Sequence, residues 1–326
     1  MFERKLNKQN KLKRILLKLL NIYAYDKETL NIVNPDYKNV SGNFIDFNNK
    51  SFNFSRGYLN ITRKIKKLDI YLRYSPNNSL WNSTSSWKRI IPNIDKETLI
   101  SVCLISLKES LIKFLETNEL NITVNLITDN SNETFDKKLI NIIKSDKYLV
   151  IKHTSKIKGN RGSYLECCDL AEKAEDLIFF IEDDYLFEQN CIEEMLLTYS
   201  RISTIINKDI CMCPSDYPFF YDSLYDTNLF IGKDYRWRSV GETLLTFLFS
   251  KHIYDKYRNL IRLVGEQENI PFEKPLHEVY KNILCLAPIS SLSYHVSRNV
   301  PSIIEDWTST WNKNYNELKK LSSNNS

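Results

Sequence analysis

The sequence predicts an α/β protein with a mostly parallel β-sheet flanked by helices, and three observations support this class. From Thr98 onward, apolar segments of strand length alternate with segments of helical length, which is the order that βαβ units produce. Several strand candidates are apolar throughout, as in LIFFI at 177–181, because a sheet covered on both faces buries both sides of each strand. With 326 residues, 42% of them hydrophobic, the chain is long enough for one large domain with an extension.

The individual elements follow from apolar runs separated by polar turns. The predicted strands are TLISVCLISL (98–107), NITVNLITD (121–129), KYLVIKHTS (147–155) and LIFFI (177–181). The predicted helices are 109–119, a segment that starts after the turn NSNET and ends near 144, and 164–174, which follows the loop KGNRGS.

The domain organisation is expected to be an extension over 1–95, a main domain over 96–300 and a tail over 301–326. The extension is rich in Asn and Ser, and within it only KLDIYLRYS at 67–75 is strand-like. Residues 11–23 have the periodicity of a basic amphipathic helix. Such a helix either packs on the protein's own core or lies on an anionic membrane surface.

Charge and cysteine content exclude several classes. The net charge is +5, but the first twenty residues contain seven bases and one acid, so the remaining chain is nearly neutral and is not expected to bind nucleic acid. The seven cysteines lack the spacing of a disulfide framework or a zinc site. No apolar run approaches the roughly 20 residues that span a membrane, and no signal peptide is evident. We expect a cytoplasmic protein, with residues 11–23 as its one candidate for peripheral membrane contact.

Three adjacent carboxylates end the strand in AEDLIFFIEDDYLFEQN, at Glu182, Asp183 and Asp184. Ligands of open α/β sheets bind beyond the carboxyl ends of strands, and Asp129 ends a second strand there. Like charges repel in a partly buried cleft unless a cation offsets them. Mg²⁺ or Mn²⁺ is the simplest such cation, because it binds one or two carboxylates together with substrate phosphates. The alternative is a solvated turn that precedes an acidic helix start.

The segment GNRGSYLECCDLAEKAEDLIFFIEDDYLF resembles the glycine loop, helix and strand that lead to the D-x-D site of GT-A-fold nucleotide-sugar glycosyltransferases, above all those of family 2. The resemblance covers about residues 98–197. It implies a GT-A (Rossmann-like) sheet, nucleotide binding by Asn160 and Gly162 of the Asn-x-Gly loop and by Asp183, and metal binding by Asp184. Asp129 stands where the family has an acid that contacts the base or ribose. The first acid of D-x-D is Glu182 here, which makes Glu182 the second candidate metal ligand.

The second half matches the family less closely. Arg236 and Arg238 flank Trp237 and either clamp a diphosphate or form surface ion pairs. His295, in SLSYHV, stands where many metal-dependent GT-A enzymes have a late histidine ligand. The alternative for His295 is a hydrogen bond within a loop.

The family's Glu-Asp pair, whose acid deprotonates the acceptor hydroxyl, is absent. In IPFEKPLHEVYKNI the nearest candidates for this catalytic base are Glu273 and Glu278, with Glu242 and Glu266 behind them. Each is otherwise an ordinary surface acid.

The resemblance implies a glycosyltransferase that uses Mn²⁺ or Mg²⁺, a nucleotide-sugar donor, and a saccharide or lipid-linked acceptor. A nucleotidyltransferase is one alternative. It usually has a Gly-rich loop after its first strand, whereas SLKES follows 98–107 without any Gly. A non-catalytic protein that binds sugar nucleotides or carbohydrates is the other, because the D-x-D motif is imperfect and the Glu-Asp pair is missing.

Overall fold

The computed structural model describes residues 51–54, 57–77, 91, 93–222, 227–296 and 305–323. The predicted helix over 11–23 lies outside these ranges. The chain divides into two compact units, residues 1–60 and 61–326. In the first unit, strands β1 (Ser51–Phe54) and β2 (Gly57–Asn60) form an antiparallel hairpin.

The second unit contains a nine-stranded sheet with the order β5-β4-β3-β6-β11-β8-β12-β10-β9. Its strands are β3 (Lys67–Tyr74), β4 (Asn121–Thr128), β5 (Leu149–Thr154), β6 (Leu177–Glu182), β8 (Cys211–Met212), β9 (Leu229–Ile231), β10 (Arg236–Val240), β11 (Phe247–Ser250) and β12 (Cys285–Ile289). The strands from β5 to β6 are parallel, and the strands from β11 to β9 form a mixed half. A separate antiparallel pair joins β7 (Tyr185–Phe187) to β13 (Ser293–His295).

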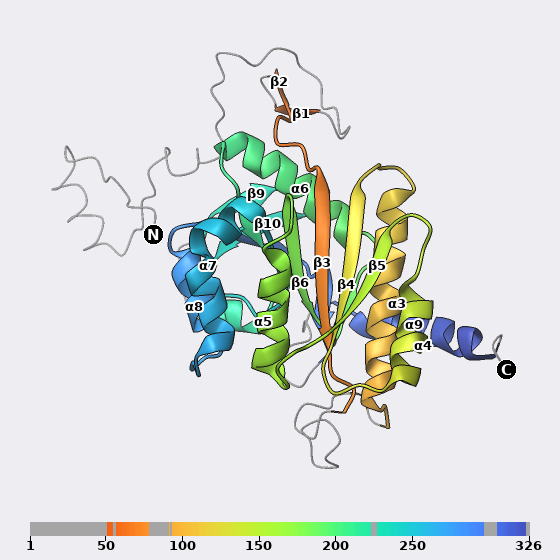
Figure 1. The fold of residues 1–326 in the computed structure, drawn as a ribbon. Helices are drawn as coiled ribbons and strands as arrows, with labels where there is room; N and C mark the ends of the chain where they lie inside the picture. Colours follow the sequence, from red (N-terminus) through yellow and green to blue (C-terminus); the bar gives the residue numbers. More distant parts are fainter. Residues whose placement is uncertain are drawn as a thin grey trace. The chain divides into compact units, whose positions relative to one another are not determined.

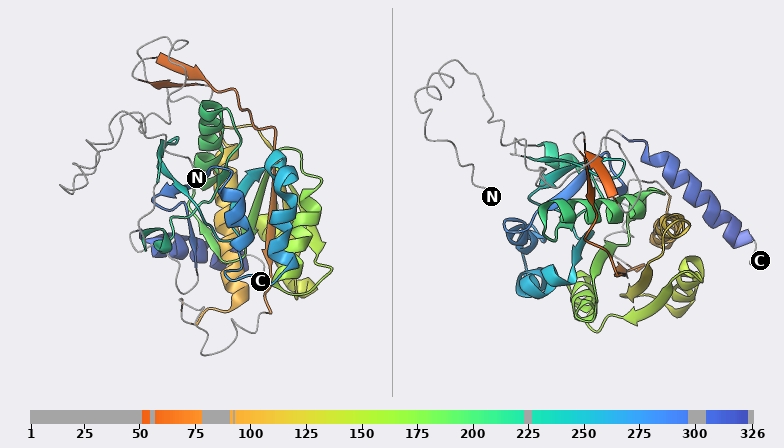
Figure 2. Two further views of the ribbon diagram at one scale, coloured as in Figure 1. Left: turned by 90° about the vertical axis from the view of Figure 1, so that its left-hand side faces the viewer. Right: turned by 90° about the horizontal axis from the view of Figure 1, so that it is seen from above.

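Helices cover the sheet in two groups. One group contains α5 (Asn160–Ala171), α7 (Lys251–Glu266) and α8 (Lys274–Tyr280); the other contains α3 (Lys96–Leu115), α4 (Glu133–Ile143), α6 (Cys191–Ile206) and α9 (Trp307–Ser323). Figure 1 shows α5, α7 and α8 on one side of β3 and β4, and α3 and α4 on the other. Figure 2 shows that the C-terminal end of α9 projects away from the sheet. A short 3₁₀ helix, η4 (Pro218–Tyr221), lies in the loop after β8.

The predicted class, a sheet flanked by helices, is confirmed, and so are the strands at 121–129, 147–155 and 177–181. The core against α5, α7 and α8 is built on Phe180, which makes edge-to-face contacts with Tyr71, Tyr164 and Phe249. Such aromatic pairs add to the stability gained from burial alone. All seven cysteines are free and buried, as expected for reduced thiols.

The predicted strand at 98–107 is wrong, because these residues belong to the 20-residue helix α3. The side chain of Asp95 caps the helix by accepting from Thr98 N at 2.6 Å. Neighbouring helices α4, α6 and α9 contact α3, so apolar residues occupy several of its faces and the helical period is hidden. The first strand of the sheet is instead KLDIYLRY, within the stretch that was expected to be an extension.

Among the described helices, none has the length and apolar character needed to cross a membrane.

Candidate active site

The carboxyl ends of β3, β4 and β6 lie side by side. The parallel register pairs Tyr74 with Thr128 and Arg73 with Glu182. The acidic residues after β6 therefore face the end of β3, as strand ends in one parallel sheet must. Asp129 follows β4 directly, and its N–H donates to Tyr74 O at 2.9 Å.

Glu182 is held by an arginine of the neighbouring strand. Arg73 Nη2 donates to Glu182 Oε1 at 2.6 Å, and the two side chains are 5% and 23% exposed. Nη1 of the same guanidinium donates to the carbonyl and side-chain oxygens of Asn160. The guanidinium also lies 5.7 Å from the Tyr164 ring centroid. Arg73 therefore joins the end of β6 to the start of α5.

Asp183 is held by a lysine. Lys96 Nζ, on the first residue of α3, donates to Asp183 Oδ1 at 2.7 Å, and Ser75 N donates to Asp183 Oδ2 at 2.8 Å. Lys96 is buried. Burial lowers the pKa of Lys96, but Asp183 and Asp184 outweigh burial, so that its pKa is raised above the ordinary value. The ammonium group therefore stays charged.

Asp184 faces a histidine. Its Oδ2 lies 3.2 Å from His295 Nε2 and 4.0 Å from Lys96 Nζ. The His295 ring stacks on Tyr185, with centroids 4.9 Å apart, and Val296 N donates to Asp184 O at 2.8 Å. Burial lowers the pKa of His295, but Asp184 outweighs it and the pKa is raised. His295 Nδ1 is buried and has no hydrogen-bond partner within the described ranges.

Each of the three carboxylates thus lies near a basic side chain of the protein itself. Arg73 pairs with Glu182, Lys96 pairs with Asp183 and lies 4.0 Å from Asp184, and His295 lies beside Asp184. Sequence reasoning missed Arg73 and Lys96, because they precede their partners by 109 and 87 residues. One signal was available for Arg73: it follows the apolar residues 70–72 of its strand, where an unpaired charge would be costly.

The loop before α5 brings Gly159 against Asp129, and Asn160 and Gly162 follow in the first turn of the helix. Gly159 N donates to Asp129 Oδ2 at 2.9 Å, and Gly159 has a φ of +91°, which favours glycine. A Cβ on Gly162 would collide with the backbone of Ile157. Gly159 therefore lets the loop reach the end of β4, and Gly162 lets the first turn of α5 pack against Ile157.

Glu273 lies within electrostatic reach of the acidic strand end. It immediately precedes α8, and its pKa is raised from 4.5 to about 7, first by burial and then by the Glu182 carboxylate. Arg73 and His295 act in the opposite direction. The charges of Glu182, Arg73 and His295 therefore all act on the Glu273 carboxyl.

The other acids considered as a base lie elsewhere. Glu278 is exposed and pairs with Lys281 at 2.6 Å. Glu266 pairs with Arg262 at 3.0 Å. The pKa of Glu242 is raised by burial and then by Asp222, with no effect from the acidic strand end.

The two arginines on β10 have different surroundings. Arg238 is buried and pairs with Asp216 at 2.5 Å. Its guanidinium lies 4.2 Å from the Tyr221 ring centroid and 4.9 Å from that of Phe220. Arg236 is exposed. The two side chains share one face of β10, but the guanidinium of Arg238 already forms an ion pair with the Asp216 carboxylate.

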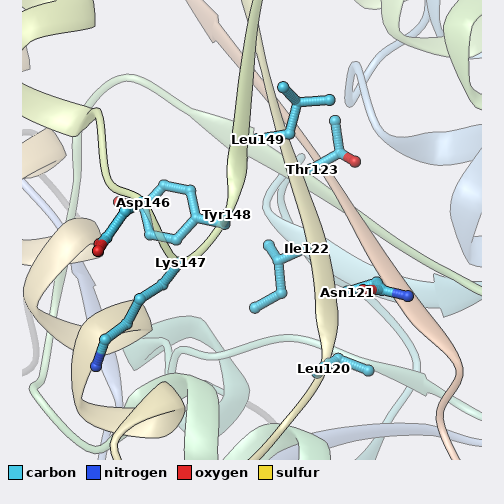
Figure 3. A pocket seen from close by; sticks show the side chains of 8 residues that line it. All are labelled: Leu120, Asn121, Ile122, Thr123, Asp146, Lys147, Tyr148 and Leu149. Atoms are coloured by element: carbon cyan, nitrogen blue, oxygen red, sulfur yellow. The ribbon is translucent and has the colours of Figure 1, made fainter.

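A shallow groove lies at the opposite ends of the strands (Figure 3). Residues 120–123 at the start of β4 and 146–149 at the start of β5 line it. Asp129 and the acidic residues are at the carboxyl ends, so this groove is separate from the candidate site.

Comparisons with known proteins give structural likenesses only. No protein-family model matches the chain, and no curated protein matches it either. Among solved structures, TarS of S. aureus is similar with a TM-score of 0.42 and 10% identity over 70% of this chain; the chain spans 36% of TarS. A UDP-glucose pyrophosphorylase in complex with UDP-glucose is similar with a TM-score of 0.43 and 13% identity, over 79% of this chain and all of that one. The glycosyltransferase GlyE of Streptococcus pneumoniae TIGR4 has a TM-score of 0.43 and 10% identity, over 79% and 64%.

Proposed function

We propose that the chain is a metal-dependent glycosyltransferase that moves a sugar from a nucleotide-diphosphate donor to a saccharide or glycolipid acceptor. The observation that carries the proposal is the pair formed by Asp184 and His295. Their Oδ2 and Nε2 atoms lie 3.2 Å apart, next to a strand end where open α/β sheets bind ligands.

The donor atoms of this pair fit a divalent cation. Ligand bonds of about 2.1 Å at right angles put neighbouring ligand atoms about 3 Å apart, close to the separation seen. The Asp184 carboxylate, donor phosphates and water are ligands that suit both Mn²⁺ and Mg²⁺, and His295 would add an imidazole nitrogen. No group of three or more ligating side chains occurs within the described residues, so donor phosphates and water would complete the shell. A bound ion would stabilise the charge that grows on the leaving diphosphate.

In this proposal the remaining site residues have separate roles. Arg73 and Lys96 hold Glu182 and Asp183 at the strand end, and Asp183 and Asp129 would contact the nucleotide. The first turn of α5, with Asn160 and Gly162, would form the wall beside the base or ribose. We propose that Glu182 positions Arg73 and is not a metal ligand, because Glu182 Oε1 already accepts a hydrogen bond from Arg73.

Glu273 is the proposed catalytic base. A carboxylate with a pKa of about 7 suits proton abstraction near neutral pH, because the most effective base has a pKa close to the working pH. Glu278 lacks this environment and is the natural control. Transfer with inversion would need one such base on the acceptor side.

A nucleotidyltransferase is disfavoured by the segment after the first strand. That strand is β3, and residues 75–95 after it contain no Gly. A phosphate-cradling loop needs glycines so that backbone N–H groups can approach the phosphates.

Thermal unfolding with UDP and Mn²⁺ tests the proposal. Wild type is expected to be stabilised by the two together, in proportion to the logarithm of ligand concentration. Asp184→Asn should lose this stabilisation and any transfer, and keep its circular-dichroism spectrum. Glu278→Gln should behave as wild type. An Asp184→Asn protein that is stabilised as strongly as wild type contradicts the proposal. A screen of nucleotide sugars under the same conditions then identifies the donor.

A further inference from the structure

Strands β9 and β10 expose aliphatic side chains on one face. Phe230 pairs with Trp237 in the register, and both are buried, with exposed fractions of 1% and 0%. Leu229 and Ile231 therefore point to the other face, because side chains alternate along a strand. They are 58% and 64% exposed, which is unusual for two large apolar residues so close together.

An exposed arginine lies between aliphatic residues on this face. Arg236 pairs with Ile231 of β9 on one side and with Ile289 of β12 on the other, and directly paired residues share a face. Arg236 takes part in none of the ion pairs formed among the described residues, whereas Arg238 pairs with Asp216. The face therefore offers a guanidinium group within apolar surroundings.

Tyr221 extends the same surface. Arg238 pairs with Leu229 in the register, and its guanidinium lies 4.2 Å from the Tyr221 ring centroid. The ring is 54% exposed, and its hydroxyl donates to Asp216 Oδ2 at 2.5 Å. We define the β9–β10 face as Tyr221, Leu229, Ile231, Arg236 and Ile289.

The loop that carries Tyr221 also borders the candidate active site. Tyr217 and Tyr185 share a hydrogen bond of 2.6 Å between their hydroxyls, and Tyr185 stacks on His295. Asp216 N donates to Ser291 Oγ at 2.7 Å, four residues before His295. A molecule on the β9–β10 face could therefore reach the site across one loop.

We propose that the β9–β10 face binds the phosphate and adjoining hydrocarbon chain of a lipid-linked saccharide acceptor. Arg236 would bind the phosphate, because a guanidinium presents paired donors to phosphate oxygens. Leu229 and Ile231 would cover the hydrocarbon, since aliphatic side chains gain from burying apolar surface and offer no partner to sugar hydroxyls. The acceptor role rests on the proposed glycosyltransferase function; the binding of an alkyl phosphate does not.

Binding of dodecyl phosphate below its micellar concentration tests the proposal, measured on the whole chain by calorimetry. Wild type is expected to bind dodecyl phosphate at least about tenfold more tightly than inorganic phosphate or the uncharged dodecyl maltoside. The double variant Leu229→Ser/Ile231→Ser and the single variant Arg236→Gln should each weaken binding about tenfold. Leu149→Ser is the matched control and should change nothing, because Leu149 is 57% exposed on the distant strand β5.

Three results would overturn the proposal. Equal weakening by Leu149→Ser would show detergent-like adsorption. Cosedimentation of the protein with phosphatidylcholine–phosphatidylglycerol vesicles, undiminished by added dodecyl phosphate, would show that the face binds a membrane surface. A dimer that the face variants convert to a monomer would show a second copy as the occupant. Stabilisation by UDP and Mn²⁺ should persist in Leu149→Ser and in the double variant Leu229→Ser/Ile231→Ser, and its absence from wild type would refute the glycosyltransferase function while leaving alkyl phosphate binding intact.

Discussion

Lys96 is the residue whose role the structure changes most. The sequence shows a lysine near the start of an apolar segment, and only the fold brings it to Asp183 and Asp184. A buried charge pair that loses one partner leaves the other uncompensated, which is far more costly than a lost surface pair.

Lys96→Met is therefore expected to lower the free energy of unfolding by about 3–5 kcal/mol. The reason is that Asp183 and Asp184 would face each other with little compensation at neutral pH. Urea denaturation at constant pH measures the loss.

Lys113→Met is the matched control, since Lys113 lies on the same helix. It pairs with Glu116, and both side chains are 49% exposed, so its loss should leave the free energy of unfolding nearly unchanged. Equal losses from the two variants would show that Lys96 does not compensate the buried carboxylates.

Glu273 makes a pH-dependent prediction. Its pKa in the folded protein is raised from 4.5 to about 7, so the folded state binds the proton more tightly than the unfolded state. The stability from this group is present at low pH and is lost as pH rises through 7. In protein free of divalent ions, Glu273→Gln should remove that part of the fall in the free energy of unfolding between about pH 5 and about pH 8.

The same substitution tests the catalytic role. Transfer by wild type should rise with pH as Glu273 loses its proton, and Glu273→Gln should lower the rate by about 10²–10⁴-fold, with stabilisation by UDP and Mn²⁺ retained. Glu278→Gln should leave both unchanged. Should Glu273→Gln keep full activity, another group is the base.

At the scale of elements, the contact between the β5–α5 loop and the first turn of α5 depends on Gly162. The Cβ of Gly162→Ala would lie 2.5 Å from the Ile157 carbonyl carbon and 2.8 Å from its Cβ, so the loop has to shift. We expect a loss of about 1–3 kcal/mol in the free energy of unfolding, as for other overpacked sites. Affinity for UDP should also fall, because the shift pulls Gly159 from Asp129.

Gly241→Ala provides the comparison for this prediction. Nothing lies within 4 Å of a Cβ at Gly241, so both stability and UDP affinity should stay near wild type. Denaturation curves of the two variants compare their stability, and thermal-shift curves with UDP compare their affinity for UDP. Indistinguishable curves would mean that the loop accommodates a methyl group freely.

Elements were predictable where the sequence pattern had one physical meaning. LIFFI is short and ends in charges, so only a buried strand fits it, and β6 spans Leu177–Glu182. The apolar run at 98–107 fitted either a strand or a helix, because a helix buried on several faces is as apolar as a buried strand. Its length and the Asp95 cap would have decided for a helix.

For the whole molecule, the sequence predicted the layered α/β class and the place of the acidic residues. The order of parallel strands brings Asp129, Asn160 and Glu182 to one edge whichever segment forms the first strand. The mixed half of the sheet was not predicted, because β8 and β9 have only 2 and 3 residues and such strands leave little pattern. The bases that balance the acids depend on long-range contacts, which no local pattern reveals.

The charge balance at the strand end affects the stability of the protein without a bound ion or substrate. Because Arg73 pairs with Glu182 and Lys96 pairs with Asp183, the charge balance of the strand end comes from the protein's own side chains. Under the proposed function, a chelator should therefore abolish transfer and leave the free energy of unfolding nearly unchanged, which urea denaturation with and without the chelator measures.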